Sequence, residues 1–128
     1  VKARFWGHLD NDSAQLKELY ESAPIFVFTS ESENFPIVLL EAMIAGAAIV
    51  TTQGTGCAEV VGDAALLVPV RDAPAIAGAL KRLQQEPELV VQLGRAARDR
   101  VMTHFGWDGV IDKHLQIYAA CGKGFEVR

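Results

Sequence analysis

The feature that most constrains the fold is an apolar, helix-like segment with a strand-like segment on each side. Residues 36–45 read PIVLLEAMIA, which opens on a proline and is followed by Gly46, a common helix stop. Residues 25–28 and 48–51 are short apolar runs of the kind that form buried strands. Because each connection is long enough for a crossover, this order predicts a parallel sheet with helices on both faces.

The rest of the chain extends this pattern. Short strands are expected at residues 4–7 and 66–68, and a helix at residues 12–22 behind a cap at Asn11 or Asp12. Three more helices, expected mainly to pack against the sheet, follow at residues 74–85, 87–104 and 107–120. The predicted class is α/β, with a partial Rossmann-like, three-layer parallel sheet and C-terminal helices.

The carboxylate of Glu41 is the one polar group in residues 36–45. A helix that is apolar on every side is normally buried, so we expect Glu41 to be shielded from water. A shielded carboxylate without hydrogen-bond donors costs several kcal/mol or more. Ligand hydroxyls would supply such donors. A neighbouring protein group would also serve, in which case Glu33 would be only a solvated loop acid.

The start of the same helix predicts an anion site. If Pro36 is the first helical residue, its missing amide hydrogen is no loss. The amides that follow would then be free to bind phosphate, namely those of Ile37, Val38 and Leu39. Glu33 precedes the helix and Glu41 lies roughly 7 to 8 Å along its axis. Hydroxyls at Glu33, a diphosphate at the amides and a ribose diol at Glu41 describe a nucleotide sugar.

The stretch FTSESENFPIVLLEAMIAGAAIVTT, residues 28–52, resembles the donor-binding signature of retaining glycosyltransferases with the GT-B fold, in particular family GT4. Other segments agree in order and spacing, among them LKELYESAPIFVFTS before it and TGCAEVVGDAALLVPVRD after it, so the resemblance covers about residues 3–118. It implies the donor-binding half of an enzyme of polysaccharide biosynthesis. Such an enzyme transfers a hexose from a nucleoside diphosphate sugar to a glycan or lipid-linked acceptor.

The resemblance also implies roles for individual residues. Two glutamates with seven residues between them flank the donor in that family, which makes Glu33 the catalytic position at the transferred sugar and Glu41 the ribose ligand. The donor sugar and phosphate would contact Asn34, Phe35, Pro36, Ile37 and Val38. Pro36 stands where many members have glycine, which keeps the helix start but removes one amide donor. We expect the Phe35 side chain to point inward.

This chain departs most from the pattern of the family at its N-terminal end. The family's domain opens with two more strand and helix units, which carry an Arg and a Lys that neutralise the diphosphate. With no initiator methionine, and Val1 directly in strand-like sequence, we predict a fragment. Residues 1–121 would be a partial donor-binding domain and residues 122–128 a tail. The expected partner is an N-terminal acceptor-binding domain. The sequence leaves open whether this domain also attaches the enzyme peripherally to a membrane.

Composition excludes several other classes of protein. The net charge of −4 and the lack of a Lys or Arg block argue against a nucleic-acid partner. No apolar run approaches the about 18 residues of a membrane span. Two isolated cysteines, Cys57 and Cys121, form no disulfide framework, so a cytoplasmic location is expected. A position at the inner face of the membrane is compatible with this expectation.

Metal chemistry is a weaker alternative. Asp10, Asn11 and Asp12 spell the acid pair with which GT-A glycosyltransferases hold a divalent ion, but Asp12 or Ser13 could equally cap the following helix. The GT-B resemblance implies no metal and no cofactor. The three histidines, His8, His104 and His114, are too scattered for a metal site.

Other interpretations remain open from the sequence. Gly54 and Gly56 could bring backbone amides to a ligand or simply mark a turn. The chain could belong to a sugar-nucleotide epimerase or phosphorylase with the same two-domain layout. It could also be a non-catalytic α/β binding module in which both glutamates are structural.

Overall fold

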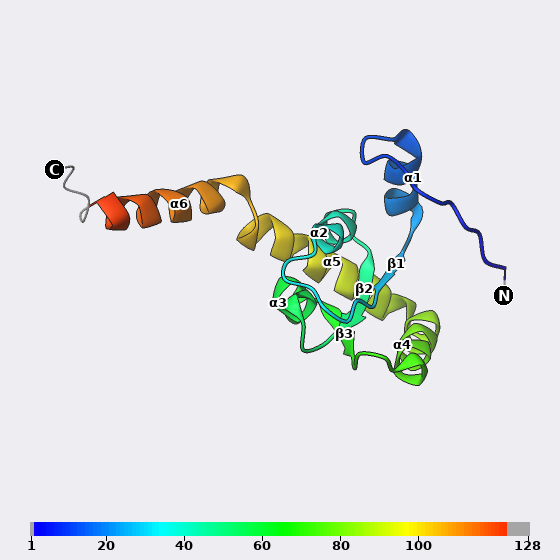
Figure 1. The fold of residues 1–128 in the computed structure, drawn as a ribbon. Helices are drawn as coiled ribbons and strands as arrows, with labels where there is room; N and C mark the ends of the chain where they lie inside the picture. The colour runs from blue at the N-terminus through cyan, green and yellow to red at the C-terminus, as the bar shows by residue number, and fades with distance from the viewer. Residues whose placement is uncertain (1, 123–128) are drawn as a thin grey trace.

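The computed structural model describes residues 2–122, which form six helices and three strands. In chain order these are α1 (Ala14–Ser22), β1 (Ile25–Phe28), α2 (Ile37–Ile44), β2 (Ala48–Thr52), α3 (Gly56–Val61), β3 (Ala65–Val68), α4 (Ala73–Gln85), α5 (Pro87–His104) and α6 (Trp107–Gly122), as drawn in Figure 1. The alternation of strands and helices confirms the predicted α/β class.

The sheet is parallel throughout, with the strand order β1-β2-β3. Ile25 of β1 pairs with Ala48 of β2, and Ile49 of β2 pairs with Ala65 of β3. Every residue of the central strand is buried, because neighbours pair with both of its edges and helices cover both of its faces. Val27 of β1 is 40% exposed, so the expectation that this strand is fully buried is wrong.

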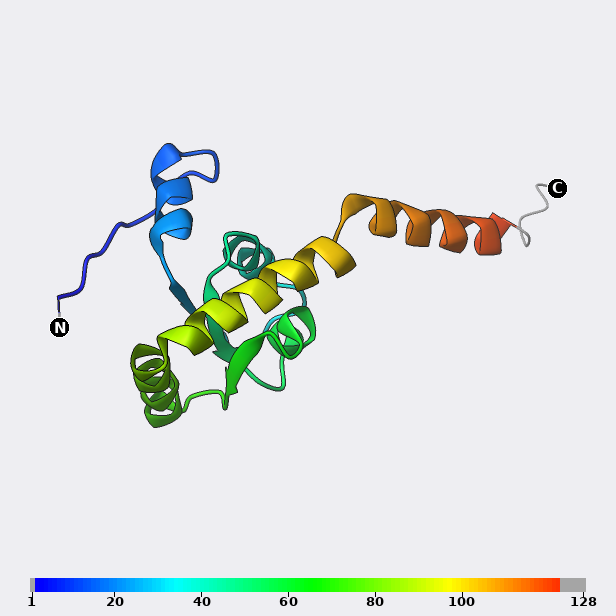
Figure 2. The same ribbon diagram turned by 180° about the vertical axis from the view of Figure 1, so that it is seen from behind.

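Helices lie on both faces of the sheet, as predicted. One core cluster joins Ile49 of β2 to α2, α3 and Ala97 of α5. The other joins the next strand residue, Val50, to α4 and Leu93 of α5. Successive strand residues point to opposite faces, which explains this division. Figure 2 shows α5 running diagonally across the molecule, and it supplies side chains to both clusters.

Helix α2 is buried on one side only. Leu39, Ala42 and Met43 are completely buried, whereas Ile37 is 65% exposed and Glu41 is also exposed. The prediction that Glu41 is shielded from water is therefore wrong. The sheet, α3 and α5 pack against one side of the helix, whereas α1, which contacts Glu41 through Tyr20, buries none of its own residues.

The largest difference from the sequence prediction is at the front of the chain. No regular structure is present in residues 2–10, so the strand predicted at residues 4–7 is wrong, and Figure 1 shows this segment leading away from β1. A strand needs a hydrogen-bonded neighbour, and this segment has none. Helix α1 begins at Ala14, and its cap is Ser13, whose Oγ accepts a hydrogen bond from the Leu16 amide at 3.3 Å.

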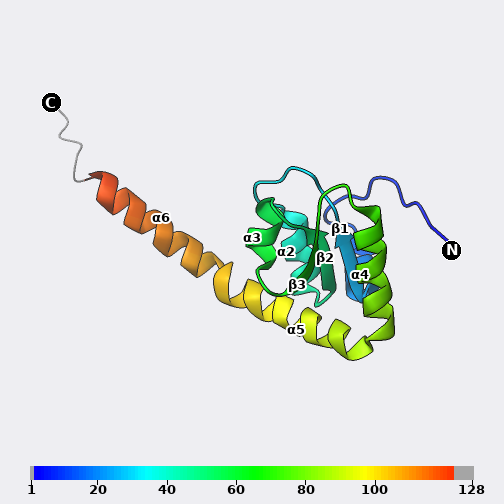
Figure 3. The ribbon, with the colours of Figure 1, turned by 90° about the horizontal axis from the view of Figure 1, so that it is seen from below.

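Helix α6 extends away from the body of the molecule, as Figure 3 shows. Its large apolar side chains are mostly exposed, and they include Trp107 at 80%, Leu115 at 59% and Tyr118 at 66%. The expectation that all three C-terminal helices pack on the sheet is therefore correct for α4 and α5 and wrong for α6. The predicted tail, apart from Gly122 at the end of α6, lies outside the described residues.

Candidate functional site

Three loops leave the carboxyl edge of the sheet together, because all three strands are parallel. They are residues 29–36 after β1, residues 53–55 after β2 and residues 69–72 after β3. In open α/β sheets ligands bind beyond this edge. The first loop, which we call the glutamate loop, carries Glu33 and leads into α2.

Two buried threonines fix the start of the glutamate loop. Thr51 and Thr52 have no solvent exposure, and their Oγ1 atoms donate hydrogen bonds of 2.6 Å to the carbonyl oxygens of Phe28 and Ser30. Buried hydroxyl groups need such acceptors, so these bonds hold the backbone at the end of β1 in place. The sequence analysis missed this role, although two polar residues at the end of an apolar strand were the signal.

Gly56, the first residue of α3, fixes the far end of the loop. Its amide donates to the carbonyl oxygen of Glu33 at 2.8 Å, and a Cβ atom at this position would lie only 1.9 Å from the carbonyl oxygen of Asn34. Only glycine fits so close an approach of two backbones. Gly54, with a φ of 74° and open space around it, marks a turn. Glu33 is thus half-buried in a firmly held loop.

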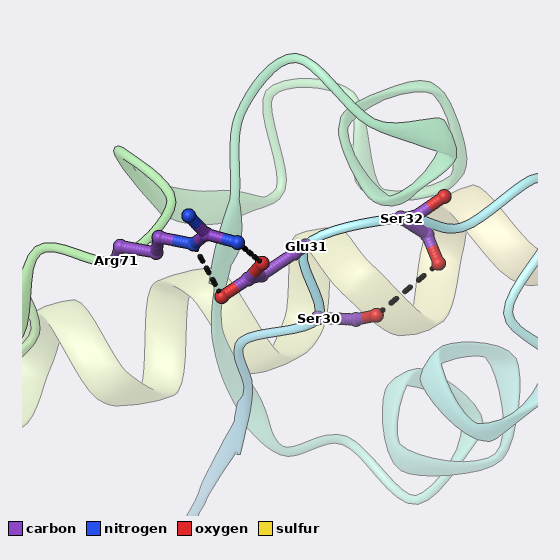
Figure 4. A network of polar contacts seen from close by, with 4 residues as sticks. All are labelled: Ser30, Glu31, Ser32 and Arg71. Carbon is purple, nitrogen blue, oxygen red and sulfur yellow. Dashed lines mark hydrogen bonds and ion pairs between the residues drawn. The ribbon is translucent and has the colours of Figure 1, made fainter.

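An ion pair attaches the middle of the glutamate loop to the turn after β3. Arg71 donates from Nε to Oε1 of Glu31 at 2.8 Å and from Nη2 to Oε2 at 2.6 Å, as Figure 4 shows. This pairing lowers the pKa of Glu31 from its ordinary value. Ser30 also donates to the carbonyl oxygen of Ser32 at 3.3 Å. The pair joins residues 40 positions apart in two loops, so no local sequence pattern could have found it.

Helix α2 begins one residue later than predicted. Pro36 is the N-cap, with φ −76° and ψ 104°, and the amide of Leu39 donates to its carbonyl oxygen at 3.1 Å. Leu39 is therefore not free to bind a ligand, and that part of the prediction is wrong. Ile37 and Val38 are the first two residues of the helix. Amides at these positions have no acceptor within the helix, because no helical turn precedes them.

The two residues between Glu33 and the cap are both exposed. Asn34 lies on the surface of the loop. Phe35 is 50% exposed and its ring centroid lies 5.7 Å from that of Phe105, in an edge-on arrangement. The prediction that Phe35 points inward is wrong, because Phe105 at the end of α5 provides an aromatic partner on the surface.

Glu41 has a protein donor. Its Oε2 accepts a hydrogen bond of 3.0 Å from the hydroxyl of Tyr20 on α1. Burial, and then this bond and the charge of Glu41, raise the pKa of Tyr20 to about 12. The sequence leaves either a ligand or a protein group as the donor to Glu41, and in the structure the donor is a protein group, the hydroxyl of Tyr20.

A pocket of about 570 Å³ lies beside this hydrogen bond. Its polar lining includes Asp12, Lys17, Tyr20, Glu41 and Arg98. Within the part of the chain that the structure describes, Glu33 does not line this pocket. The structure therefore places Glu33 at the sheet edge, outside the pocket that Glu41 lines on the outer side of α2.

Residues 2–122 contain no group of three or more His, Cys, Asp or Glu side chains arranged to hold a metal ion. His8 Nε2 lies 3.8 Å from Asp10 Oδ1, and both side chains are exposed. Over the same residues, no helix has the length and apolar character needed to cross a bilayer.

Similarity to known proteins agrees with the fold. Residues 2–100 match the family model described as "Glycosyl transferases group 1". Over 123 residues the chain is 34% identical to the glycogen synthase of Mycobacterium tuberculosis strain H37Rv, covering 94% of this chain and 29% of that protein. The chain thus spans less than a third of the length of this relative.

Solved structures give the same result. Sucrose-phosphate synthase from Thermosynechococcus elongatus superposes with a TM-score of 0.83 at 30% identity, over 95% of this chain and 31% of that one. HepE from Anabaena, solved in complex with UDP, superposes with a TM-score of 0.72 at 19% identity, over 87% of this chain and 30% of that one. The chain belongs to the group 1 glycosyltransferase family and has the fold of the C-terminal, Rossmann-like half of GT-B glycosyltransferases.

Proposed function

We propose that this chain is the donor-binding half of a retaining, GT4-type glycosyltransferase. The full protein transfers a hexose from a nucleoside diphosphate sugar to a glycan or lipid-linked acceptor. The observation that carries this proposal is the half-buried Glu33, in a loop fixed by Gly56 and directly ahead of the first amides of α2. Membership of the family supports sugar transfer, and UDP in the related HepE structure supports the donor class.

The chemistry follows from where negative charge develops. As the glycosidic bond breaks, charge grows on the diphosphate, and donors already aimed at it stabilise the transition state more than the ground state. The amides of Ile37 and Val38 and the positive end of α2 serve this role. Glu33 orients the transferred sugar, with Asn34 and Phe35 beside it in the loop. None of these steps requires a metal or a cofactor.

Glu41 binds the ribose in this proposal. Tyr20 occupies one carboxylate oxygen, Oε2, and the other oxygen accepts a hydroxyl of the ribose diol. The hydrogen bond from Tyr20 orients the carboxylate without neutralising it. The contribution of Glu41 is therefore to the affinity for the nucleotide, because ribose does not change during the reaction.

The donor half alone is inactive in this proposal. A helix end contributes only about 0.3 to 1 kcal/mol for each interaction with an anion, which cannot by itself stabilise a leaving diphosphate. Further cationic groups and an acceptor-binding N-terminal domain belong to the rest of the protein. We propose that the whole enzyme acts in the cytoplasm, where nucleotide sugars are its substrates.

The test is steady-state kinetics of the full-length protein, with acceptor-dependent release of nucleoside diphosphate as the signal. Glu33→Gln keeps the size of the side chain and is expected to lower kcat by about 100-fold or more, as loss of a key transition-state contact does. Glu41→Gln is expected to raise the KM for the donor by about 10-fold with little change in kcat. Glu88→Gln, an exposed glutamate on α5, is the matched control.

Parental constants for both Glu33→Gln and Glu41→Gln would contradict the assignment of the site. Nucleotide turnover that does not need an acceptor would favour an epimerase or phosphorylase. Binding of the nucleotide sugar without any turnover would favour a non-catalytic binding module.

A further inference from the structure

Arg71 has an unusual backbone conformation. Its φ is 59°, and among the residues that the structure describes it is the one residue other than glycine with a positive φ. Side-chain atoms make this left-handed conformation unfavourable, so glycine is the residue that normally occupies it. Such an outlier persists only where surrounding interactions hold it, and outliers of this kind cluster at functional sites.

The side chain of Arg71 forms two parallel hydrogen bonds with the carboxylate of Glu31. The pair reaches from the turn after β3 to the glutamate loop after β1, and so passes beyond the end of the central strand (Figure 4). Glu31 is two residues before Glu33 in the same loop. Both partners are exposed, at 77% for Arg71 and 52% for Glu31. Exposed ion pairs add little to the stability of a fold, so stability does not explain this arrangement.

The ion pair differs from the other attachments of the glutamate loop. Thr52 and Gly56 bind the backbone carbonyl oxygens of Ser30 and Glu33, and the stretch between these two points has one local hydrogen bond, from Ser30 to the carbonyl oxygen of Ser32. Within this stretch, the side chain of Glu31 is the group that bonds to a different loop, the turn after β3. Two parallel hydrogen bonds to a planar guanidinium fix orientation as well as distance.

We propose that Arg71 is a positioning residue: by clamping Glu31, it fixes the bend of the glutamate loop and so presets the carboxylate of Glu33 for the donor sugar. This inference rests on the proposed function, in which Glu33 contacts that sugar. A carboxylate that is displaced by a fraction of an ångström still binds the donor but stabilises the transition state less well. Loss of the clamp therefore lowers kcat and leaves the KM for the donor nearly unchanged.

The experiment compares three variants of the full-length enzyme. Arg71→Gly removes the guanidinium and suits the left-handed backbone, so the turn keeps its shape. Glu31→Gln removes the charge at constant size, and the third variant combines both changes. Each single variant is expected to lower kcat by about 10-fold with the donor KM within about twofold. The combined variant is expected to be no slower than either single one, because both changes break the same contact.

A matched pair elsewhere provides the control. Arg82 and Glu86 form an exposed ion pair of 3.1 Å at the end of α4, away from the glutamate loop. Arg82→Gly and Glu86→Gln are expected to leave kcat unchanged. Hydrogen exchange on the same proteins provides a second readout, in which Arg71→Gly is expected to speed exchange at the amides of residues 31–34 and Arg82→Gly is not.

The outcomes separate this inference from the proposed function. If Glu33→Gln is inactive while Arg71→Gly and Glu31→Gln keep the parental kcat, the positioning role is wrong and the proposed function stands. If Arg71→Gly is slow and Glu31→Gln is not, Arg71 acts without Glu31 and the inference is also wrong. If Glu33→Gln itself keeps the parental kcat, the proposed function fails, and the inference that rests on it fails with it.

Discussion

The hydrogen bond between Tyr20 and Glu41 connects helix α1 to helix α2. Glu41 was singled out because a charged residue interrupts an apolar segment. Tyr20 lies within the predicted helix at residues 12–22, and no local sequence signal gives it a role in the site. In the structure its ring centroid lies 5.7 Å from that of Phe26 while its hydroxyl reaches Glu41, so one side chain both packs and donates.

The burial of Tyr20 and its hydrogen bond to Glu41 predict a dependence of stability on alkaline pH. The pKa of Tyr20 rises from 10.0 to about 12 on folding, so the folded protein retains a proton that the unfolded chain loses. The resulting stabilisation is fully present below pH 10 and is lost as the pH rises from 10 to 12. We expect a phenolate absorbance titration to contain a component near pH 12 that disappears in Tyr20→Phe. Tyr118→Phe, at an exposed position on α6, should retain it.

Sequence reasoning predicted the ends of helix α2 better than the surroundings of its side chains. The start of α2, within one residue, and the stop at Gly46 follow from local signals of proline and glycine, whereas the role of Glu33 stays a prediction. The burial of Glu41 was misjudged, because a periodic pattern shows which side of a helix is apolar but not whether another element covers it. The pair of Arg71 with Glu31 depends on the parallel strand order, which brings together residues that are far apart in sequence.

At the scale of elements, helix α5 determines how closely the layers pack. It crosses the end of α2 at Gly94, where a Cβ atom would lie 2.1 Å from the carbonyl oxygen of Gly46. Gly46 itself has a φ of 85° and turns the chain from α2 toward β2. A side chain at Gly94 would therefore separate α5 from the backbone that connects these two elements.

We expect Gly94→Ala to destabilise the protein by about 1 to 3 kcal/mol, the usual cost of overpacking a close contact. Gly78→Ala is a matched control, because Gly78 is also in a helix but its added Cβ would meet no atom within 4 Å. That substitution should stabilise the protein by about 0.5 to 1 kcal/mol, since alanine favours a helix over glycine. Urea denaturation of both variants measures the difference, and equal effects would contradict the close approach of α5.

At the scale of the whole molecule, the layered body and helix α6 differ in how they are held. The body has two core clusters on the two faces of its sheet. Three large apolar side chains of α6, those of Trp107, Ile111 and Leu115, are more than half exposed. The sequence predicted this helix from its periodicity, but periodicity could not show that its apolar side has no cover in the body of the molecule.

This difference predicts two rates of amide hydrogen exchange in the 128-residue chain. Amides of β2 and α5 should exchange slowly, because they open only when the core clusters separate. Amides of α6 should exchange faster, since few tertiary contacts stabilise the helix. Hydrogen exchange followed by mass spectrometry gives both rates. Equal protection of α5 and α6 would show that α6 packs against a surface that this structure does not contain.

The three attachments of the glutamate loop have a consequence for recombination within the family. Their donors come from Thr52, Gly56 and Arg71, which belong to three successive parts of the chain. A chimaera that takes residues 29–36 from a relative would bring in a loop whose shape depends on the hydrogen-bond donors of that relative. Transplanting the span from residue 29 to residue 72 as one block would keep each contact with its partner, which makes this block, rather than the loop, the natural unit to exchange between relatives.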